Sequence, residues 1–234
     1  MPLTSIEPRR LYRQIAEQIR GLITTGEYAV GARLPPERDL AKQLRVSRPS
    51  VREALIALEV EGLVEVRVGS GIYVHAAVGV GASNAANSGH HAGPFDLIRA
   101  RKAIEGECAA LAAREGKRPQ LVQIAEALKQ MEEDASKMAQ PLEADRQFHL
   151  RVAEATNNVA LVHVVKELWE ERGGPLFTKL QHHFDTPKSW SAAIREHTAV
   201  LEAIRGHDPE KARATMHLHM EQAAKRFSKS WDGR

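Results

Sequence analysis

The stretch that decides the fold of the N-terminal half is residues 35–74, PPERDLAKQLRVSRPSVREALIALEVEGLVEVRVGSGIYV. It opens with a Pro-Pro breaker, and residues 37–44 then carry apolar side chains at helical spacing. A second helix is predicted from Ser47, whose hydroxyl can accept from the amides of the first turn, to Gly62. Residues 64–68 alternate apolar and polar side chains before the glycines at 69 and 71, which predicts a β-hairpin closing on residues 72–74.

A further helix is predicted upstream, over residues 10–25, and it stops at Gly26. Its apolar stripe consists of Leu11, Ile15, Ile19, Leu22 and Ile23. Three helices followed by a glycine-tipped hairpin predict a winged helix-turn-helix, an α+β fold that binds DNA.

Charge in this half is concentrated rather than global. The whole chain has a formal net charge of only +3. Residues 33–52, however, hold six basic side chains against two acidic ones, and phosphate binding depends on such local clusters. Arg48 and Arg52 share one face of the helix that starts at Ser47 and would enter the major groove, where a guanidinium fork suits guanine edges or phosphate. A solvated basic helix face is the alternative, but the hairpin and helix caps favour DNA binding.

Composition narrows the class of protein further. The chain has 234 residues, 43% of them apolar, and a single cysteine, Cys108, so no disulfide can form within it. The first residues lack the apolar core of a signal peptide, and no uncharged apolar run approaches the roughly 18 residues of a membrane span. We therefore expect a cytoplasmic protein without membrane contact.

A linker separates the two halves. Residues 75–93 read HAAVGVGASNAANSGHHAG, a composition that gains little from burial. We therefore expect a winged helix-turn-helix domain over residues 1–75, a linker over residues 76–93 and an all-helical domain over residues 94–234.

Several apolar stripes of the helical domain are interrupted by a polar residue. Arg101 and Glu105 interrupt the stripe of residues 95–114. The other interruptions are Asp145 and His149 in residues 142–156, His197 in residues 187–205, and His219 in a last helix that Asp208 caps.

Buried charge is expensive unless it is paired or bound to metal. One aspartate and three histidines therefore suggest a divalent transition metal site, zinc first, with nickel or manganese as alternatives. Only i,i+4 spacing lets Asp145 and His149 converge from one helix. Each histidine could instead be a hydrogen-bonded core residue. Five others have no such position and are predicted not to be ligands: His163, His182, His183, His207 and His217.

At this point a resemblance is clear. PPERDLA (35–41), VSRPSVREAL (46–55) and the Leu-Glu-x-Glu-Gly-Leu of residues 58–63 resemble the DNA-binding domain of the GntR superfamily. The resemblance implies that Arg38, Arg48, Arg52 and the wing glycine Gly69 contact DNA, and we count Ser47 with them. Pro36 stands where that family usually has serine, which removes a helix-capping hydroxyl but no expected DNA contact.

The helical half resembles the FCD domain of the FadR-type branch of this superfamily, which implies an antiparallel helical bundle around an effector cavity. The family's metal-binding Asp-x-x-x-His and its two later histidines match Asp145, His149, His197 and His219. Its Arg-x-x-x-Glu matches Arg101 and Glu105, which implies that the arginine contacts a carboxylate effector. Asn158 matches an asparagine near the family's cavity and is predicted to bind the effector.

A narrower resemblance joins IEPRRLY (6–12), EVEG (59–62), VEVRVGSGI (64–72) and GPF (93–95) to the hexuronate-utilisation repressors. It implies a repressor released from double-stranded operator DNA by a sugar acid, and we expect it to bind a palindromic operator as a homodimer. Lactate, glycolate or citrate as the effector, or the metal itself as the signal, remain open. An enzyme is not expected, because the chain lacks HExxH, a nucleophile elbow, a P-loop and Rossmann glycines.

Overall fold

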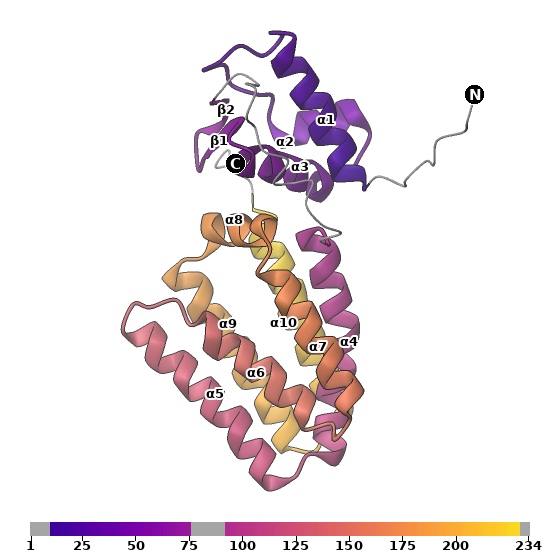
Figure 1. The fold of residues 1–234 in the computed structure, drawn as a ribbon. Helices are drawn as coiled ribbons and strands as arrows, with labels where there is room; N and C mark the ends of the chain where they lie inside the picture. The colour runs from indigo at the N-terminus through magenta and orange to yellow at the C-terminus, as the bar shows by residue number, and fades with distance from the viewer. Residues whose placement is uncertain (1–9, 76–91, 230–234) are drawn as a thin grey trace, which may run out of the picture. The chain divides into compact units, whose positions relative to one another are not determined.

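The computed structural model describes residues 10–75 and 92–229. Contacts divide the chain into two compact units, Met1–Gly93 with Ser228–Arg234, and Pro94–Phe227 (Figure 1). The predicted linker, residues 76–93, falls almost wholly outside the described residues. Within the described residues, no helix is both long enough and apolar enough to cross a membrane.

The N-terminal unit is the expected winged helix-turn-helix. It contains α1 (Leu11–Thr24), α2 (Glu37–Leu44) and α3 (Arg48–Val60), followed by β1 (Val64–Arg67) and β2 (Gly71–Val74). The strands pair antiparallel, with Val64 opposite Val74 and Val66 opposite Ile72. The order of three helices and a hairpin confirms the prediction made from the spacing of apolar residues.

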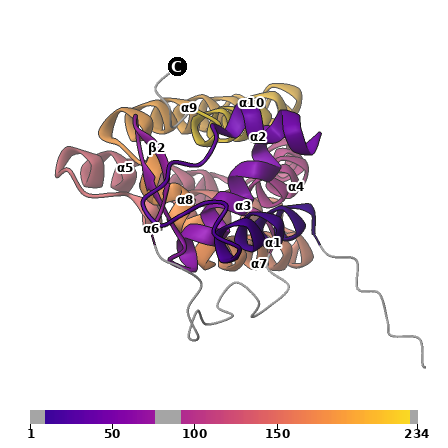
Figure 2. The same ribbon diagram turned by 90° about the horizontal axis from the view of Figure 1, so that it is seen from above.

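Local chemistry sets the ends of these elements. Ser47 caps α3 as predicted, with its Oγ accepting from the Ser50 amide at 3.3 Å. Gly62, with a φ of +75°, takes the left-handed conformation just after the helix, which glycine adopts without steric cost. α1 packs against α3, and the two helices lie side by side in Figures 1 and 2.

The buried face of α1 shares Ile15, Ile19 and Ile23 with the predicted stripe, but Leu11 is exposed and Leu22 only half-buried. Leu11 is 47% exposed, whereas the neighbouring Tyr12 is buried. The buried positions are Tyr12, Ile15, Ala16, Ile19 and Ile23. The buried face therefore includes the first aromatic residue, which has more apolar surface to bury than a leucine at the frayed start of the helix.

The described part of the C-terminal unit consists of helices, as expected: α4 (Pro94–Glu115), α5 (Arg118–Ser136), α6 (Leu142–Glu154), α7 (Val159–Arg172), α8 (Pro175–Phe184), α9 (Pro187–Arg205) and α10 (Pro209–Phe227). α4 packs against α10, α7, α6 and α9, while α9 also packs against α10 and α5. The long helices form a bundle, and the short α8 lies across one end of it (Figure 1).

Caps fix where the helices that carry the site begin. Thr186 Oγ1 accepts from the Ser189 amide at 3.1 Å at the start of α9. Asp208 Oδ1 accepts from the Lys211 amide at 3.0 Å at the start of α10, as predicted. Each cap satisfies an amide that the helix itself leaves unpaired, so the register of the polar residues further along α9 and α10 is well defined.

Candidate metal centre, effector pocket and DNA-binding surface

The four residues predicted to bind metal come together inside the bundle. Asp145 and His149 lie one turn apart on α6, His197 lies on α9 and His219 on α10. All four are buried, and one potential ligand atom from each lies within 4.8 Å of the others. The structure thus brings together residues that are up to three helices apart in the sequence.

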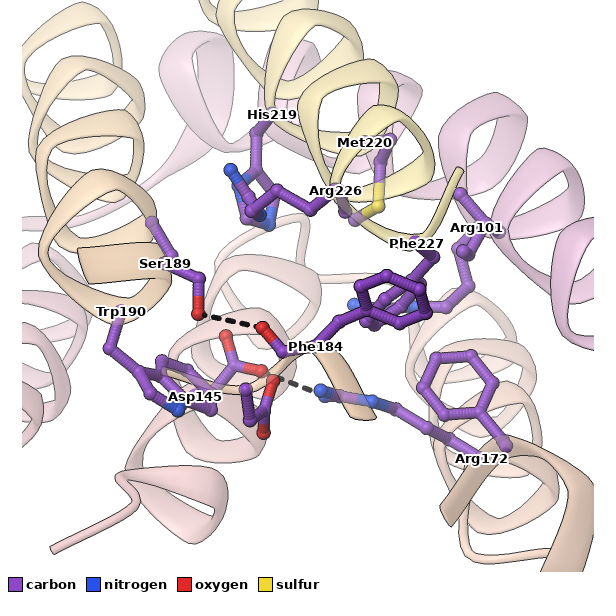
Figure 3. Close-up of a pocket in the computed structure, with 15 residues that line it drawn as sticks. Arg101, Asp145, Arg172, Phe184, Ser189, Trp190, His219, Met220, Arg226 and Phe227 are labelled. Carbon is purple, nitrogen blue, oxygen red and sulfur yellow. Dashed lines mark hydrogen bonds and ion pairs between the residues drawn. The ribbon is translucent and has the colours of Figure 1, made fainter. Parts of the chain in front are cut away.

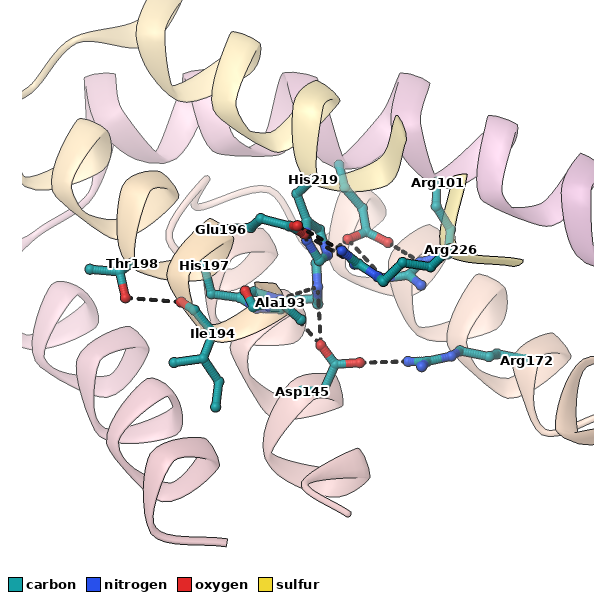
Figure 4. Close-up of polar contacts among 12 residues, drawn as sticks. Arg101, Asp145, Arg172, Ala193, Ile194, Glu196, His197, Thr198, His219 and Arg226 are labelled. Carbon is teal, nitrogen blue, oxygen red and sulfur yellow. Dashed lines mark hydrogen bonds and ion pairs between the residues drawn. The ribbon is translucent and has the colours of Figure 1, made fainter. Parts of the chain in front are cut away.

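The potential ligand atoms converge closely (Figure 4). His149 Nε2 lies 3.1 Å from His197 Nε2. Asp145 Oδ1 lies 3.2 Å from His197 Nε2 and 3.6 Å from His149 Nε2. The His219 ring packs on that of His197, with ring centroids 4.2 Å apart.

Each imidazole is oriented by a partner at its other nitrogen. His197 Nδ1 donates to the Ala193 carbonyl at 2.7 Å, and His219 Nδ1 donates to Glu196 Oε2 at 2.8 Å. His149 Nδ1 lies against Oε2 of Glu105. A proton held at Nδ1 leaves the Nε2 lone pair free, which is the arrangement that outer partners impose on histidines that bind metal.

Asp145 has two different neighbours for its two oxygens. Oδ1 faces the histidines, whereas Oδ2 accepts from Arg172 Nη1 at 2.7 Å. Burial would raise the pKa of this carboxyl, but Arg172 and the histidine contacts hold the pKa well below its usual value. Asp145 is therefore an anion in the folded protein, as a metal ligand must be.

The pKa values of the three histidines are shifted in different directions. Burial lowers the pKa of His197, and burial together with the neighbouring imidazoles lowers the pKa of His219 well below its usual value. Burial opposes the proton on His149 too, but Glu105 and Asp145 raise its pKa. Neutral imidazoles are the ligand form, and one carboxylate with three imidazoles fits a divalent transition ion such as zinc.

The five histidines predicted not to be ligands lie outside this group. His207 Nδ1 is 2.9 Å from the Ala113 carbonyl. His217 is only two residues from His219, but it packs on Gly106, where an added Cβ would lie 2.2 Å from its Nε2. The periodicity argument therefore separated the histidines of the cluster from those outside it.

Arg101 and Glu105 form the buried pair expected on α4. Arg101 Nε donates to Glu105 Oε1 at 2.6 Å, and the guanidinium stacks on Trp169 at 4.1 Å from the ring centroid. Burial opposes ionisation of Glu105, yet Arg101 and His149 lower its pKa to about 2. Glu105 therefore connects Arg101 directly to a residue of the metal cluster.

A pocket adjoins the cluster (Figure 3). Its cavity volume is about 50 Å³. Asp145 and His219 line it together with three arginines, Arg101, Arg172 and Arg226. A pocket bounded by a candidate metal site and several guanidiniums is suited to a small anion.

Arg172 and Arg226 were missed from the sequence. Arg226 forms an ion pair with Glu196, the residue that orients His219, at 2.6 Å. One signal existed for each arginine. Arg172 lies three residues after the buried Trp169, and Arg226 lies seven residues after His219, so each shares a helix face with a residue of the site.

Asn158 is placed differently from the prediction. It is exposed and caps α7, with its Oδ1 accepting from the Ala160 amide at 3.0 Å and the Leu161 amide at 3.4 Å. It is not among the residues that line the pocket. In this structure the Asn158 side chain is engaged by the helix end, and effector binding by Asn158 stays a prediction.

The N-terminal unit exposes most of the residues predicted to contact DNA. The Arg38 and Arg48 side chains are 73% and 48% exposed, and Ser47 is exposed at the start of α3. Gly69 is exposed in the turn between the strands, with a φ of +82°. These residues are available to a DNA backbone or groove.

Arg52 is the exception. Its side chain is 2% exposed and pairs with the buried Glu37 of α2, with Arg52 Nε donating to Glu37 Oε1 at 2.6 Å. Arg52 lies on the same helix face as Arg48, as expected, but Arg48 is exposed whereas Arg52, one turn further along α3, is buried. In this structure Arg52 forms a buried ion pair that joins α2 to α3, and its contact with DNA stays a prediction.

A winged helix-turn-helix with exposed arginines, together with a bundle that encloses a metal-type cluster beside an anion pocket, defines a ligand-sensing transcription regulator. Residues 11–74 match the family described as bacterial regulatory proteins, gntR family, and residues 96–222 match the FCD domain. The chain belongs to the GntR family of DNA-binding transcription regulators and carries an FCD domain.

Two relatives cover most of the chain. The Uxu operon transcriptional regulator of Escherichia coli (strain K12) is 38% identical over 224 residues, 94% of this chain and 87% of that protein. The Exu regulon transcriptional regulator of the same strain is 39% identical over 220 residues, 92% of this chain and 83% of that protein. Among solved structures, E. coli McbR/YncC shares the fold with a TM-score of 0.50 at 23% identity, covering 94% of this chain and 97% of that one.

Proposed function

We propose that this protein is a cytoplasmic repressor of hexuronate catabolism that leaves its operator when a sugar acid binds in the helical bundle. The observation that carries the proposal is the position of Arg101, which lines the same pocket as Asp145 and His219 of the metal cluster. The names of the Uxu and Exu relatives support a hexuronate as the effector.

Asp145, His149, His197 and His219 would hold a divalent transition metal, zinc first, with nickel or manganese as alternatives. When bound, the metal would supply a positive centre for a hydroxyl or keto oxygen of the acid. Arg101 would hold the carboxylate in a two-pronged pair. Glu105, which pairs with Arg101 in this structure, would then be displaced by the ligand carboxylate.

This exchange offers a route to the DNA. Arg101 and Glu105 lie on α4, which directly follows the linker in the sequence. A ligand that moves Arg101 therefore acts on the first helix after the DNA-binding unit along the chain. Such a ligand shifts the equilibrium only by its difference in affinity for the two arrangements. We therefore assign release to preferential binding of the acid to an arrangement with low DNA affinity.

A homodimer is part of the proposal. A palindromic operator pairs two winged helices through one two-fold axis. Sedimentation equilibrium should give twice the chain mass, and a monomer at all concentrations would contradict this part.

The test of the function uses an operator fragment that the protein itself selects from genomic DNA. D-galacturonate or D-glucuronate should release the wild-type, zinc-loaded protein from that fragment. Arg101→Ala and Arg101→Lys should bind the fragment but no longer respond, because neither variant retains the guanidinium fork. Arg99→Ala is the matched control, because Arg99 lies on the same helix with a side chain that is 79% exposed.

If Arg101→Ala responds at the wild-type concentration of galacturonate, the carboxylate is held elsewhere and the proposed switch is wrong. The second candidate function is a repressor for which the metal is the signal, and the four-residue cluster favours it as an alternative. In that case zinc alone should change operator affinity, and sugar acids should change nothing further.

A further inference from the structure

One end of the pocket is formed by residues that do not belong to the metal cluster, although Arg172 there pairs with Asp145. There its wall is formed by the C-terminus of α8 and the start of α9, which contribute Asp185, Ser189 and Trp190, and by Arg172 of α7 (Figure 3). The proposed function uses Arg101 and the cluster but none of these α8 and α9 residues. Their chemistry therefore bears on what the rest of an effector molecule looks like.

Two hydrogen-bond donors at this end lack a partner among the described residues. Trp190 is 8% exposed, and its indole Nε1 is buried without a hydrogen-bond partner. Arg172 Nε is likewise buried and unpartnered, although its Nη1 donates to Asp145. A buried donor without an acceptor costs free energy, so both atoms are suited to a ligand oxygen.

An acceptor lines the same pocket. Asp185 Oδ2 accepts from Gln181 Nε2 at 2.7 Å, which leaves Oδ1 able to accept from a ligand. Burial raises the pKa of Asp185, as expected for a carboxyl group in a partly closed pocket. Ser189 does not belong to this set, because its Oγ accepts from the Thr186 amide at 2.8 Å and donates to the Thr186 carbonyl at 2.8 Å as part of the cap of α9.

A buried donor and a carboxylate in one pocket complement hydroxyl groups, which accept one hydrogen bond and donate another. We propose that Asp185 and Trp190 bind hydroxyl groups on the carbon chain of the effector, so that the pocket selects polyhydroxy acids over two- and three-carbon hydroxy acids. This inference rests on the proposed function, because it places the carboxylate end of the acid at Arg101 and the cluster.

Selectivity follows from the length of the ligand. A short acid such as lactate or glycolate places its carboxylate and one hydroxyl at the cluster end and has no further group for Asp185 or Trp190. A sugar acid carries additional hydroxyls along its chain. Removing a group that hydrogen-bonds to a charged partner typically weakens binding about ten- to hundredfold.

The experiment is isothermal calorimetry on the full-length, zinc-loaded chain with four sodium salts: D-galacturonate, D-glucuronate, L-lactate and glycolate. Trp190→Phe removes the indole N–H and keeps an aromatic ring. Asp185→Asn keeps the shape and removes the charge. Asp134→Asn is the matched control, because Asp134 also accepts from a glutamine four residues away on its helix, Gln130, but lies outside this pocket.

The wild-type protein should bind the sugar acids at least tenfold more tightly than the short acids. Asp185→Asn should lose about ten- to hundredfold in sugar-acid affinity, and Trp190→Phe, which removes a neutral donor, about two- to tenfold. In both variants the short-acid affinity should be unchanged and the zinc content equal to that of the control. Unchanged sugar-acid affinity in both variants overturns the inference while leaving the proposed function intact. An equal loss for both classes of acid also overturns it, because the residues would then act at the carboxylate end. If no acid of either class binds the wild-type protein, the proposed function itself fails.

Discussion

His219→Ala and His217→Ala are a matched pair that tests the metal cluster. The two positions are about 200° apart around α10, and only His219 belongs to the cluster. His219→Ala removes one of four ligands. It does not strand Glu196, because that carboxylate keeps its ion pair with Arg226 at 2.6 Å. The main loss is therefore metal affinity.

The magnitude follows from binding linkage. A metal present at 100 times its Kd stabilises the folded state by about 2.7 kcal/mol. Removal of a ligand should raise Kd about a hundredfold or more, since even residues that only orient ligands are worth 10- to 100-fold. The stabilisation then falls to about 0.4 kcal/mol. The difference of about 2 kcal/mol corresponds to roughly 5–10 °C in Tm for a protein of this size.

The assay is thermal melting of each variant with zinc and with excess chelator, together with metal analysis after dialysis. The wild-type protein and His217→Ala should both lose Tm on chelation, whereas the Tm of His219→Ala should fall by only about 1–2 °C. Comparing each variant with itself removes the effect of the cavity that the alanine leaves. Equal metal content in the two variants would falsify the assignment of His219 as a ligand.

Three further predictions concern residues outside the cluster. Arg48→Ala should weaken operator binding by about 1–3 kcal/mol at nearly unchanged stability. Arg52→Ala should lower the free energy of unfolding by up to about 3–5 kcal/mol, because the buried Glu37 keeps only the longer contact to Arg48, at 3.7 Å. Urea denaturation and a DNA-binding titration separate the two variants, and equal stabilities would contradict the buried pair. Asn158→Ala should cost about 1 kcal/mol of stability through the lost helix cap and leave the response to galacturonate intact. A variant that keeps its stability but no longer responds would support effector binding by Asn158 instead. Cys108 is 1% exposed, and burial raises the pKa of its thiol to about 12. A thiol reagent at pH 8 should therefore label Cys108 only after unfolding, and rapid labelling of the native protein would refute this burial.

The fold was predictable from the sequence because its signals are local. Residues 37–44 and residues 187–205 were predicted as helices with the bounds that the structure has. The Ser47 cap and the Gly62 stop depend on the backbone amides and carbonyls of a single turn, so no tertiary information is needed to find them. The choice between Leu11 and Tyr12 does depend on what packs against α1, and there the prediction was wrong.

The site was predictable where a polar residue interrupts an apolar stripe. Asp145, His149, His197 and His219 carry this signal, and so do Arg101 and Glu105. The burial of Arg52 could not be predicted in the same way. An arginine on a helix face gives the same sequence pattern whether its side chain contacts DNA or a buried glutamate from α2. Nor could Asp185, which follows the last residue of α8 and owes its place in the pocket to the turn between two helices.

The distribution of the cluster along the chain has a consequence for protein synthesis. The first two ligands lie on α6, the third on α9 and the fourth on α10. During translation the site cannot be completed until α10 has left the ribosome, so a nascent chain that lacks this helix offers at most three of the four ligands. Completion of the candidate metal site thus follows assembly of the bundle, and a chain terminated before α10 would lack the complete site even if its DNA-binding domain had already folded.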